Sequence, residues 1–357
     1  SRFITEFDCL CWTRSPSIPD RCAAYRVRGD IMKISAMSTA FPKTLLTNSV
    51  LAEQYPDWDM PRLVERTGVH ARYVADETET ALDLAESAAQ NLIEEQNFSI
   101  SKLDALIVCT ETPDYIVPGN ASVLQHRLGV RTDAFCLDIN MGCSAFPYLL
   151  QIADGLLRGG IAKTVMILTA DTYTRFIHPE DRSTRTLFGD GAAATLLVDN
   201  PKAERFLSVF GSRGDLFARF FVKRGGTRFM KNDETDELPD IENFIQMDGL
   251  KILSFFSDVV PKAVKASLQK NKLDIQKIDA FVFHQASAVA LDTVQRLIGI
   301  PDSKMVRAFS HVGNLVSASV PVALDSAIRD GRVKSGDLVL LCGFGVGLSW
   351  GVTVIKI

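Results

Sequence analysis

The sequence has 357 residues, 46% of them hydrophobic and 23% charged, and its 39 basic and 43 acidic residues give a net charge of −4. This composition excludes a disordered or fibrous protein, and the length excludes a small binding module and predicts two domains or one two-lobed unit. The near balance of charge predicts no nucleic-acid partner and no attraction to an anionic membrane, so we expect a small or locally docked partner.

Residues 1–31 show neither strand nor helix periodicity, and they contain no secretion signal. We expect a disordered or irregular extension, with Met32 as the more natural start. The seven cysteines include no CxxC pair and no spacing typical of zinc or of a disulfide framework, which favours a cytoplasmic location. The five histidines include no HxxxH or HExxH pair, so we expect no metal and no cofactor.

From Met32 the chain alternates predicted strands and helices. MKISAMSTAFP begins as a strand, and a helical segment precedes the buried strand ALIVC at 105–109. A further apolar strand begins the segment FCLDINMGCSAFPYLLQIADGLLRGG and leads through a short turn into a helix with apolar residues at roughly helical spacing. FGDGAAATLL at 188–197 is predicted to be a turn into a buried strand, and we assign no chemistry to its Asp190.

The second half of the chain repeats this pattern. Residues 91–108 align without a gap on 266–283, and a second block aligns the segment around Gly142 with that around Gly313. The matched pairs are Ile100/Ile275, Lys102/Lys277, Asp104/Asp279, Ala105/Ala280, Gly142/Gly313, Asp154/Asp325, Arg158/Arg329, Gly160/Gly331 and Lys163/Lys334. We therefore predict an α/β protein made of two duplicated halves, 32–204 and 205–357, with mainly parallel sheets covered on both faces.

The longest uncharged run, Leu338 to Ile355, is near the length of a membrane-spanning helix. Gly343, Gly345, Gly347 and Gly351 interrupt it. We predict two buried strands around a glycine turn, and no membrane insertion.

Cys143 is the candidate nucleophile, because it falls at or next to the predicted N-terminus of the helix in the segment FCLDINMGCSAFPYLLQIADGLLRGG. Unpaired backbone N–H groups and the helix dipole favour a thiolate there, which predicts a lowered thiol pKa. The alternative is a small buried cysteine, and we keep that interpretation for the other six cysteines.

Two more candidate side chains lie in the second half. His284 lies at the C-terminal end of the predicted strand AFVFH, and Asn314 follows Gly313 at the position equivalent to Cys143 after Gly142. Sites in open α/β sheets gather at such strand ends, so Cys, His and Asn are predicted to share one site. The alternatives are a core histidine and an ordinary helix N-cap. GFGVGLSWG is either a tight hairpin or a segment whose N–H groups approach a ligand.

Six ordered motifs carry a family resemblance: ERTGVHARYV, DINMGCSAF, RSTRTLFGDGAAATLL, FVFHQAS, VGNLVSASVPVALDSAIRDGRVKSGDLVLL and GFGVGLSWG. Over 32–357 the chain resembles β-ketoacyl-acyl carrier protein synthase III of the thiolase superfamily. The resemblance implies a thiolase-like duplicated αβαβα five-layer fold and a homodimer.

The resemblance also assigns roles to residues. It implies that Cys143 takes an acyl group from acyl-CoA, and that His284 and Asn314 stabilise the enolate formed when malonyl-acyl carrier protein loses CO2. The backbone N–H groups of Cys143 and Gly347 would form a second oxyanion hole. Arg66 and Arg182 match positions that hold the nucleotide end of coenzyme A.

Several positions depart from the family pattern. A tryptophan that often stacks on adenine is Arg62 here, with Trp58 nearby but out of register. The arginine that often meets the carrier protein is Val289, and Arg296 is the candidate substitute. Val117 stands where a bulky residue often closes the partner subunit's acyl pocket, which predicts room for a longer or branched acyl group.

Two further departures adjoin the predicted site. Leu315 and Val316 replace Thr and Ser after Asn314, and Val346 replaces the middle residue of a triple glycine. We expect both changes to reshape the pocket without removing a reacting group. Glu111 lies near the place where the related HMG-CoA synthases carry a catalytic glutamate, but we expect a solvated carboxylate at a strand end.

The resulting function is a decarboxylating condensation of an acyl-CoA primer with malonyl-acyl carrier protein. The alternative is an acyltransferase that moves the acyl group from Cys143 to an alcohol or amine without decarboxylation. The intact Asn314 argues against that alternative. A catalytically silent partner subunit is a third possibility, which the presence of all three reacting residues disfavours.

Overall fold

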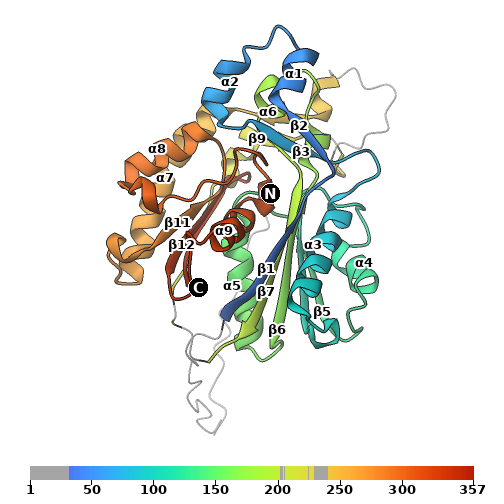
Figure 1. Ribbon diagram of the computed structural model, residues 1–357, viewed down its shortest axis with the longest axis vertical. Coiled ribbons are helices and arrows are strands. Elements are labelled where there is room, and N and C mark those ends of the chain that lie inside the picture. The colour runs from blue at the N-terminus through green and yellow to red at the C-terminus, as the bar shows by residue number, and fades with distance from the viewer. Residues whose placement is uncertain (1–31, 202–203, 205, 224, 229–239) are drawn as a thin grey trace, which may run out of the picture.

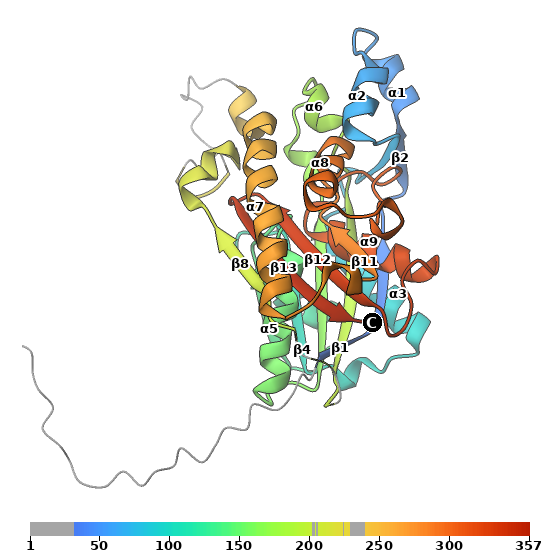
Figure 2. The same cartoon turned by 90° about the vertical axis from the view of Figure 1, so that its left-hand side faces the viewer.

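The computed structural model describes residues 32–201, 204, 206–223, 225–228 and 240–357. The extension predicted at residues 1–31 lies outside this described part. Two sheets stand side by side, with helices between them and on both outer faces (Figures 1 and 2). This order gives the five αβαβα layers that the family resemblance predicts.

The first sheet has the strand order β1-β7-β6-β4-β5. Its strands are β1 (Met32–Ala40), β4 (Ala105–Cys109), β5 (Phe135–Ile139), β6 (Thr164–Asp171) and β7 (Gly191–Asp199). β4 pairs in parallel with β5 and β6, whereas β7 pairs antiparallel with β6 and with β1. Helices α3 (Ala81–Gln96) and α4 (Asn120–Arg127) cover its outer face.

The second sheet has the order β11-β12-β13-β8. Its strands are β8 (Val209–Ser212), β11 (Ala280–Phe283), β12 (Leu338–Gly345) and β13 (Ser349–Lys356). β11 and β12 are parallel, and the other pairs are antiparallel. Helices α7 (Gly249–Lys270) and α8 (Ala288–Ile298) form the outer layer on this side (Figure 2).

The middle layer contains one helix from each half. α5 (Ala145–Arg158) belongs to the first half but packs on β12 and β13, and α9 (Ser319–Arg329) belongs to the second half but packs on β1 and β7 (Figure 1). Leu149, Ala153 and Leu156 of α5 are buried, as their helical spacing predicts. Each half therefore contributes a helix that rests on the sheet of the other half.

Short elements gather at one end of the sheets, the upper end in Figure 1. They are β2 (Thr44–Thr47), α1 (Asn48–Gln54), α2 (Met60–Thr67), β3 (Ala71–Val74), α6 (Arg182–Arg185), β9 (Phe220–Val222) and β10 (Ile245–Met247), with short 3-10 turns between them. This is the end at which β4, β6, β11 and β12 finish, so residues that follow these strands lie beneath the short elements.

The prediction of mainly parallel sheets is wrong. The strands ALIVC, AFVF and the two strands within 338–355 are confirmed, but β12 and β13 are joined by only three residues. A connection that short forces an antiparallel pair, because a parallel pair needs a long crossover. The uncharged run is thus a hairpin, and no helix in the described residues is long and apolar enough to cross a membrane.

Paired contacts repeat between the halves at the matched positions. The Asp104 carboxylate accepts hydrogen bonds from the Lys163 and Thr164 amides at 2.8 and 3.1 Å, and Asp279 accepts one from the Leu338 amide at 2.9 Å. The Arg158–Asp154 ion pair on α5 (2.6 Å) has a counterpart in Arg329–Asp325 on α9 (2.9 Å). The shared residues of the repeat therefore fix the same strand starts and helices in each half.

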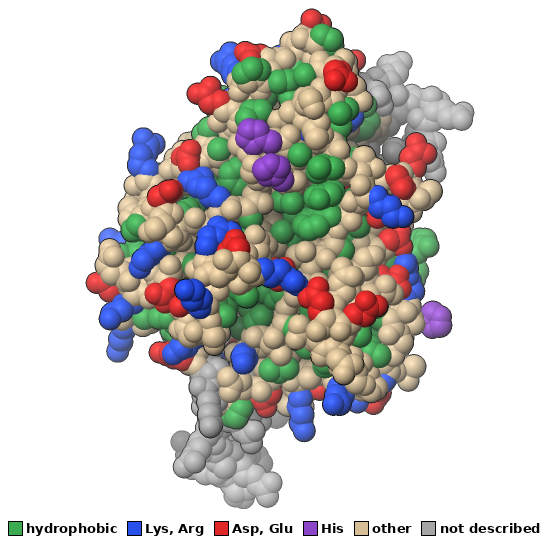
Figure 3. Space-filling model, viewed as in Figure 1, with side chains coloured by type: hydrophobic (Ala, Val, Ile, Leu, Met, Phe, Trp, Pro, Cys, Tyr) green, Lys and Arg blue, Asp and Glu red, His purple; other side chains and the backbone are tan. Residues whose placement is uncertain are grey.

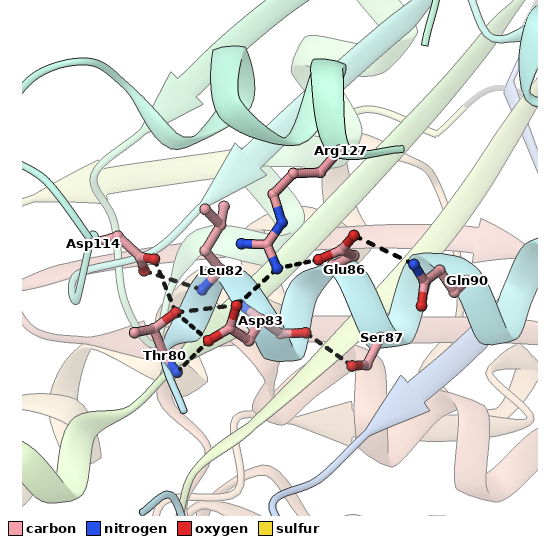
Figure 4. Close-up of polar contacts among 8 residues, drawn as sticks. All are labelled: Thr80, Leu82, Asp83, Glu86, Ser87, Gln90, Asp114 and Arg127. Atoms are coloured by element: carbon pink, nitrogen blue, oxygen red, sulfur yellow. Dashed lines mark hydrogen bonds and ion pairs between the residues drawn. The ribbon is translucent and has the colours of Figure 1, made fainter. Parts of the chain in front are cut away.

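The loop that follows β4 is anchored to α3. Thr80 and Asp83 form a capping box at the start of α3, and Asp114 accepts hydrogen bonds from the Thr80 hydroxyl (2.9 Å) and the Leu82 amide (3.3 Å), as Figure 4 shows. Arg127 of α4 pairs with Asp83 and Glu86 of α3. These contacts fix the base of the loop that carries Val117.

Charged side chains of both signs are interspersed over the face in Figure 3. On this face the described chain carries no extended area of one charge. That agrees with the overall charge of −4 and with the absence of a predicted nucleic-acid surface.

We predict that Ile107→Ala in β4 destabilises the fold by about 2–5 kcal/mol, because Ile107 is fully buried and its loss leaves a cavity. Ile161→Ala is the matched control, since this isoleucine is 60% exposed. It should change the free energy of unfolding by no more than about 0.5 kcal/mol. Urea denaturation measures both. Equal effects of the two substitutions would contradict the assignment of β4 to the core.

Candidate active site

Cys143 lies directly before the N-cap residue Ser144 of α5, as the sequence predicts. Its side chain is packed under the end of β12. A Cβ built on Gly345 would lie 2.2 Å from the Cys143 Cβ and 2.8 Å from its Sγ, so only glycine fits there. The nucleophile position is therefore set by contact between the two halves.

His284 and Asn314 are brought together from separate elements. His284 follows β11, where its amide bonds the Cys342 carbonyl at 2.7 Å. Asn314 is held by backbone bonds to Leu187 (2.9 Å) and Gly189 (3.1 Å) of the first half. The Asn314 Nδ2 lies 3.3 Å from the His284 Nε2, which makes the pair that the sequence predicts.

One cavity of about 320 Å3 reaches Cys143, His284 and Asn314. These three residues are only 3%, 2% and 4% exposed, whereas Leu250 and Val289 on the same cavity are 76% and 39% exposed. The cavity therefore runs from the surface to a buried end that contains all three predicted reacting residues. Aromatic side chains line its inner part: Phe188, Phe220, Phe256 and Phe344.

Burial determines the charge state of the reacting groups. It raises the pKa of the Cys143 thiol well above its usual range, and the charge of Glu111 raises it further. The prediction of a lowered thiol pKa at the helix N-terminus is therefore wrong. Burial also lowers the pKa of His284 to about 3, so the imidazole is neutral at physiological pH.

A neutral His284 is suited to donating a hydrogen bond rather than to carrying charge. No atom among the described residues bonds its Nδ1, so the ring is free to hold its proton on either nitrogen. With the proton on Nε2, that atom and the Asn314 Nδ2 are both donors toward one oxygen between them. Such a fixed pair stabilises negative charge that develops on the oxygen.

Glu111 is not the solvated carboxylate that the sequence predicts. It lies beside Gly142, and the Tyr173 hydroxyl donates a hydrogen bond to its Oε2 at 3.0 Å. Burial, together with the charge of Asp171, raises the pKa of Glu111 to about 8. The position of Glu111 at a strand end suggested contact with solvent. The prediction fails because Gly142 and Tyr173, which lie far from Glu111 in the sequence, pack against its carboxylate.

Asp171 and Tyr173, at the end of β6, are site residues that the sequence analysis missed. Asp171 is fully buried, and it bonds the Glu111 amide at 2.8 Å and the Ser317 amide at 3.1 Å. The sequence signal that could have identified Asp171 is an acidic residue at the end of the apolar strand TVMILTAD. The same signal is given by Asp190, an acidic residue next to the apolar strand that follows it. Asp190 is also buried, and its bonds to Thr174 and Ala75 confirm a structural role.

The glycine turn between β12 and β13 borders the nucleophile. Gly347 has φ +129°, a conformation that other residues rarely adopt. A Cβ on Gly142 would lie 2.8 Å from the Val346 Cγ1, so the valine that replaces a family glycine packs against the Cys143 segment. The role of the Gly347 N–H group as an oxyanion donor stays a prediction.

The predicted coenzyme A residues lie at the cavity mouth or next to it. Arg66, in the last turn of α2, lines the cavity, and Arg182 begins α6, whose next residue Ser183 also lines it. Arg62 is exposed one turn before Arg66. Trp58 stacks on Tyr55, with ring centroids 4.1 Å apart, so it is engaged within its own loop.

The other two predicted contact residues are on the surface. Arg296 is exposed on α8, the helix on which Val289 lines the cavity mouth. Val117 is 81% exposed, next to the exposed Tyr115 and Ile116, and it does not line the cavity of its own chain. No group of three metal-ligating side chains occurs in the described residues.

The chain is similar in sequence to a family of known proteins. Two models of the family described as 3-oxoacyl-(acyl-carrier-protein) synthase III match residues 137–214 and, for its C-terminal part, residues 268–357. A β-ketoacyl-(acyl-carrier-protein) synthase III of Clostridium perfringens is 34% identical over 323 residues, which cover 88% of this chain and 96% of the relative.

Solved structures agree with the sequence matches. A crystal structure of a 3-oxoacyl-(acyl-carrier-protein) synthase III superposes with a TM-score of 0.88 at 38% identity, covering 92% of this chain and all of that one. A 3-oxoacyl-(acyl-carrier protein) synthase from Burkholderia xenovorans LB400 gives 0.85 at 28% identity, covering 92% and 95%.

We predict that Glu111→Gln lowers the pKa of Cys143. The thiol titrates above the Glu111 pKa of about 8, where Glu111 is negative and opposes a second negative charge nearby. The pH profile of Cys143 alkylation by iodoacetamide, followed by peptide mass, should shift to lower pH. Glu79→Gln is the control, because burial also raises the pKa of Glu79 but its charged neighbours are Asp76, Lys43, Asp83 and Arg175. An unmoved or upward-shifted profile for Glu111→Gln would contradict the prediction.

Proposed function

The chain belongs to the 3-oxoacyl-(acyl-carrier-protein) synthase III family, and we propose that Cys143, His284 and Asn314 carry out its reaction. This reaction condenses an acyl-CoA primer with malonyl-acyl carrier protein, releases CO2 and gives a 3-oxoacyl-acyl carrier protein. The observation that carries the assignment is the shared cavity, in which the buried Cys143 meets the His284–Asn314 pair.

In the first half-reaction, Cys143 is acylated. Its thiol loses a proton, the sulfur attacks the thioester carbonyl of acyl-CoA, and the bond to the coenzyme A sulfur breaks as that thiol leaves with a proton. Because burial favours the neutral thiol, the thiolate forms in the presence of the primer, whose carbonyl receives its charge. The N–H groups of Cys143 and Gly347 are the proposed donors to the carbonyl oxygen.

In the second half-reaction, malonyl-acyl carrier protein loses CO2. The electron pair of the broken bond moves to the thioester oxygen, which accepts hydrogen bonds from His284 and Asn314. The enolate carbon then attacks the acyl carbonyl on Cys143, the bond to the Cys143 sulfur breaks, and the released thiolate takes up a proton from solvent to regenerate the thiol. A neutral imidazole is a suitable donor here, because it holds its proton throughout.

The acyltransferase alternative uses Cys143 in the same way but needs no enolate stabilisation. The 3.3 Å contact between Asn314 and His284 at the buried end of the cavity supports condensation instead. Acyl transfer to an alcohol or amine also calls for a base, and His284 has a pKa of about 3.

Basic side chains at the cavity mouth and near it are suited to binding the substrates. Arg66, which lines it, and Arg182, beside it on α6, are the proposed contacts of the coenzyme A phosphates. Arg296 on the exposed side of α8 is the proposed contact of an acidic carrier protein, supported by its place on the same helix as Val289.

We propose a homodimer of chains that each contain the halves 32–204 and 205–357. The strands of each sheet come from one half, which supports this division. The segment Tyr115–Val117 is 55%, 76% and 81% exposed, an apolar surface that a partner subunit would cover. Val117 would then close the acyl pocket of the partner.

We predict that Cys143→Ala abolishes acylation by acyl-CoA, measured as the gain in intact mass. His284→Ala and Asn314→Ala should keep acylation but slow the release of labelled CO2 from malonyl-acyl carrier protein by about 100- to 1,000-fold. Cys342→Ala, which removes another fully buried thiol, is the control and should still acylate. Acylation of Cys143→Ala would contradict the nucleophile assignment, and acylation without CO2 release in the unaltered protein would favour the acyltransferase.

We predict that Val117→Phe shifts the primer preference toward shorter acyl chains, by about tenfold or more in relative kcat/KM. A panel of acyl-CoAs of increasing length measures the preference, and sedimentation measures the dimer. Ile161→Phe, which places the same ring at another exposed β-branched residue, is the control. An unchanged preference in a dimeric Val117→Phe would place the end of the acyl pocket elsewhere.

A further inference from the structure

Asp171 bridges the two halves of the chain beside the reacting residues. Its side chain is fully buried at the end of β6, and its two oxygens bond different halves. We propose that Asp171 is a positioning residue that orients the Asn314 amide for decarboxylation. The inference rests on the proposed function of Asn314.

The two oxygens of Asp171 face opposite halves. Oδ1 accepts hydrogen bonds from the Glu111 amide at 2.8 Å and the Thr110 hydroxyl at 3.2 Å, both in the first half. Oδ2 accepts bonds from the Ser317 amide at 3.1 Å and from the Ser317 hydroxyl, in the second half. One carboxylate therefore holds the ends of β4 and β6 against the turn that follows Asn314.

That turn sets the direction of the Asn314 side chain. The Asn314 Oδ1 accepts a hydrogen bond from the Val316 amide at 3.0 Å, which leaves Nδ2 pointing to His284. Val316 has φ +52°, which is unfavourable for a β-branched residue and needs support from its surroundings. The Asp171–Ser317 bonds hold the residue directly after Val316, so they stabilise this conformation.

The backbone hydrogen bonds of Asn314 do not orient its side-chain amide. Leu187 and Gly189 fix the Asn314 backbone, whereas the amide group is fixed by Val316 and, beyond it, by Asp171. A carboxylate suits the place because it only accepts hydrogen bonds and every neighbour named here donates. Its burial raises the pKa of Asp171 to about 6, so the ionised, accepting form is the main one at neutral pH.

Asp171→Asn tests the inference, because the new NH2 group would face a donor on one side. We expect acylation of Cys143 not to be slowed, because this step does not use Asn314 and because the lost Asp171 charge contributes to the raised pKa of the thiol. CO2 release by the acylated enzyme should fall by roughly 10- to 100-fold, as expected for a misplaced donor. A role in folding alone would slow both half-reactions by the same factor, and that result would overturn the inference.

Two further variants keep the test decisive. Asp190→Asn is the matched control, because Asp190 is also fully buried, bonds Thr174 and Ala75, and has a pKa raised to about 6. It should leave the ratio of the two rates unchanged. Ser317→Ala removes one bond to Asp171 and should lower the ratio in the same direction as Asp171→Asn, by less. If Asp171→Asn does not fold, an unchanged ratio in Ser317→Ala overturns the inference.

Failure of the proposed function gives a different result. In that case the unaltered protein itself would show no acylation of Cys143 or no CO2 release. If the unaltered protein performs both half-reactions and the ratio in Asp171→Asn is unchanged, only the positioning role fails.

Discussion

The close contact of β12 with the start of α5 is the constraint on which the site depends. A Cβ on Gly343 would lie 2.7 Å from the Ser144 Cα, and one on Gly345 would lie 2.2 Å from the Cys143 Cβ. The Ser144 and Ser349 hydroxyls, 2.7 Å apart, bond across the same contact. Any larger residue at either glycine would separate the halves and remove Cys143 from the cavity that it shares with His284 and Asn314.

The same contact explains why the reacting groups are uncharged before substrate binds. Closing β12 over Cys143 removes water, which raises the pKa of the thiol and lowers that of His284. A charged thiolate–imidazolium pair is therefore disfavoured, and in the proposed reaction the negative charge develops on the substrate. Fixed neutral donors in a dry cavity stabilise such charge more strongly than water does.

Local sequence patterns and the internal repeat predicted the strands, the helices and the candidate site residues. Cys143, His284 and Asn314 were found because each follows a strand or a glycine at matched positions, and the family resemblance gave them roles. The strand directions were partly missed, because the three-residue link between β12 and β13 outweighs the strand–helix alternation. The Cys143 pKa, the burial of Glu111 and the role of Asp171 depend on partners up to 146 residues away, such as Ser317, and no local pattern reports them.

The duplication also explains why the site lies between the halves. β6 and β12 are matched strands of eight residues, each begun by an amide bonded to Asp104 or Asp279, so their last residues, Asp171 and Gly345, occupy equivalent places. Asp171 reaches the turn after Asn314, and Gly345 contacts Cys143, which is the counterpart of Asn314. Each central strand thus ends on the helix start of the other half. The strand β12 ends in a glycine, which leaves room for the proposed nucleophile Cys143, and β6 ends in a carboxylate, which holds the turn after the proposed donor Asn314.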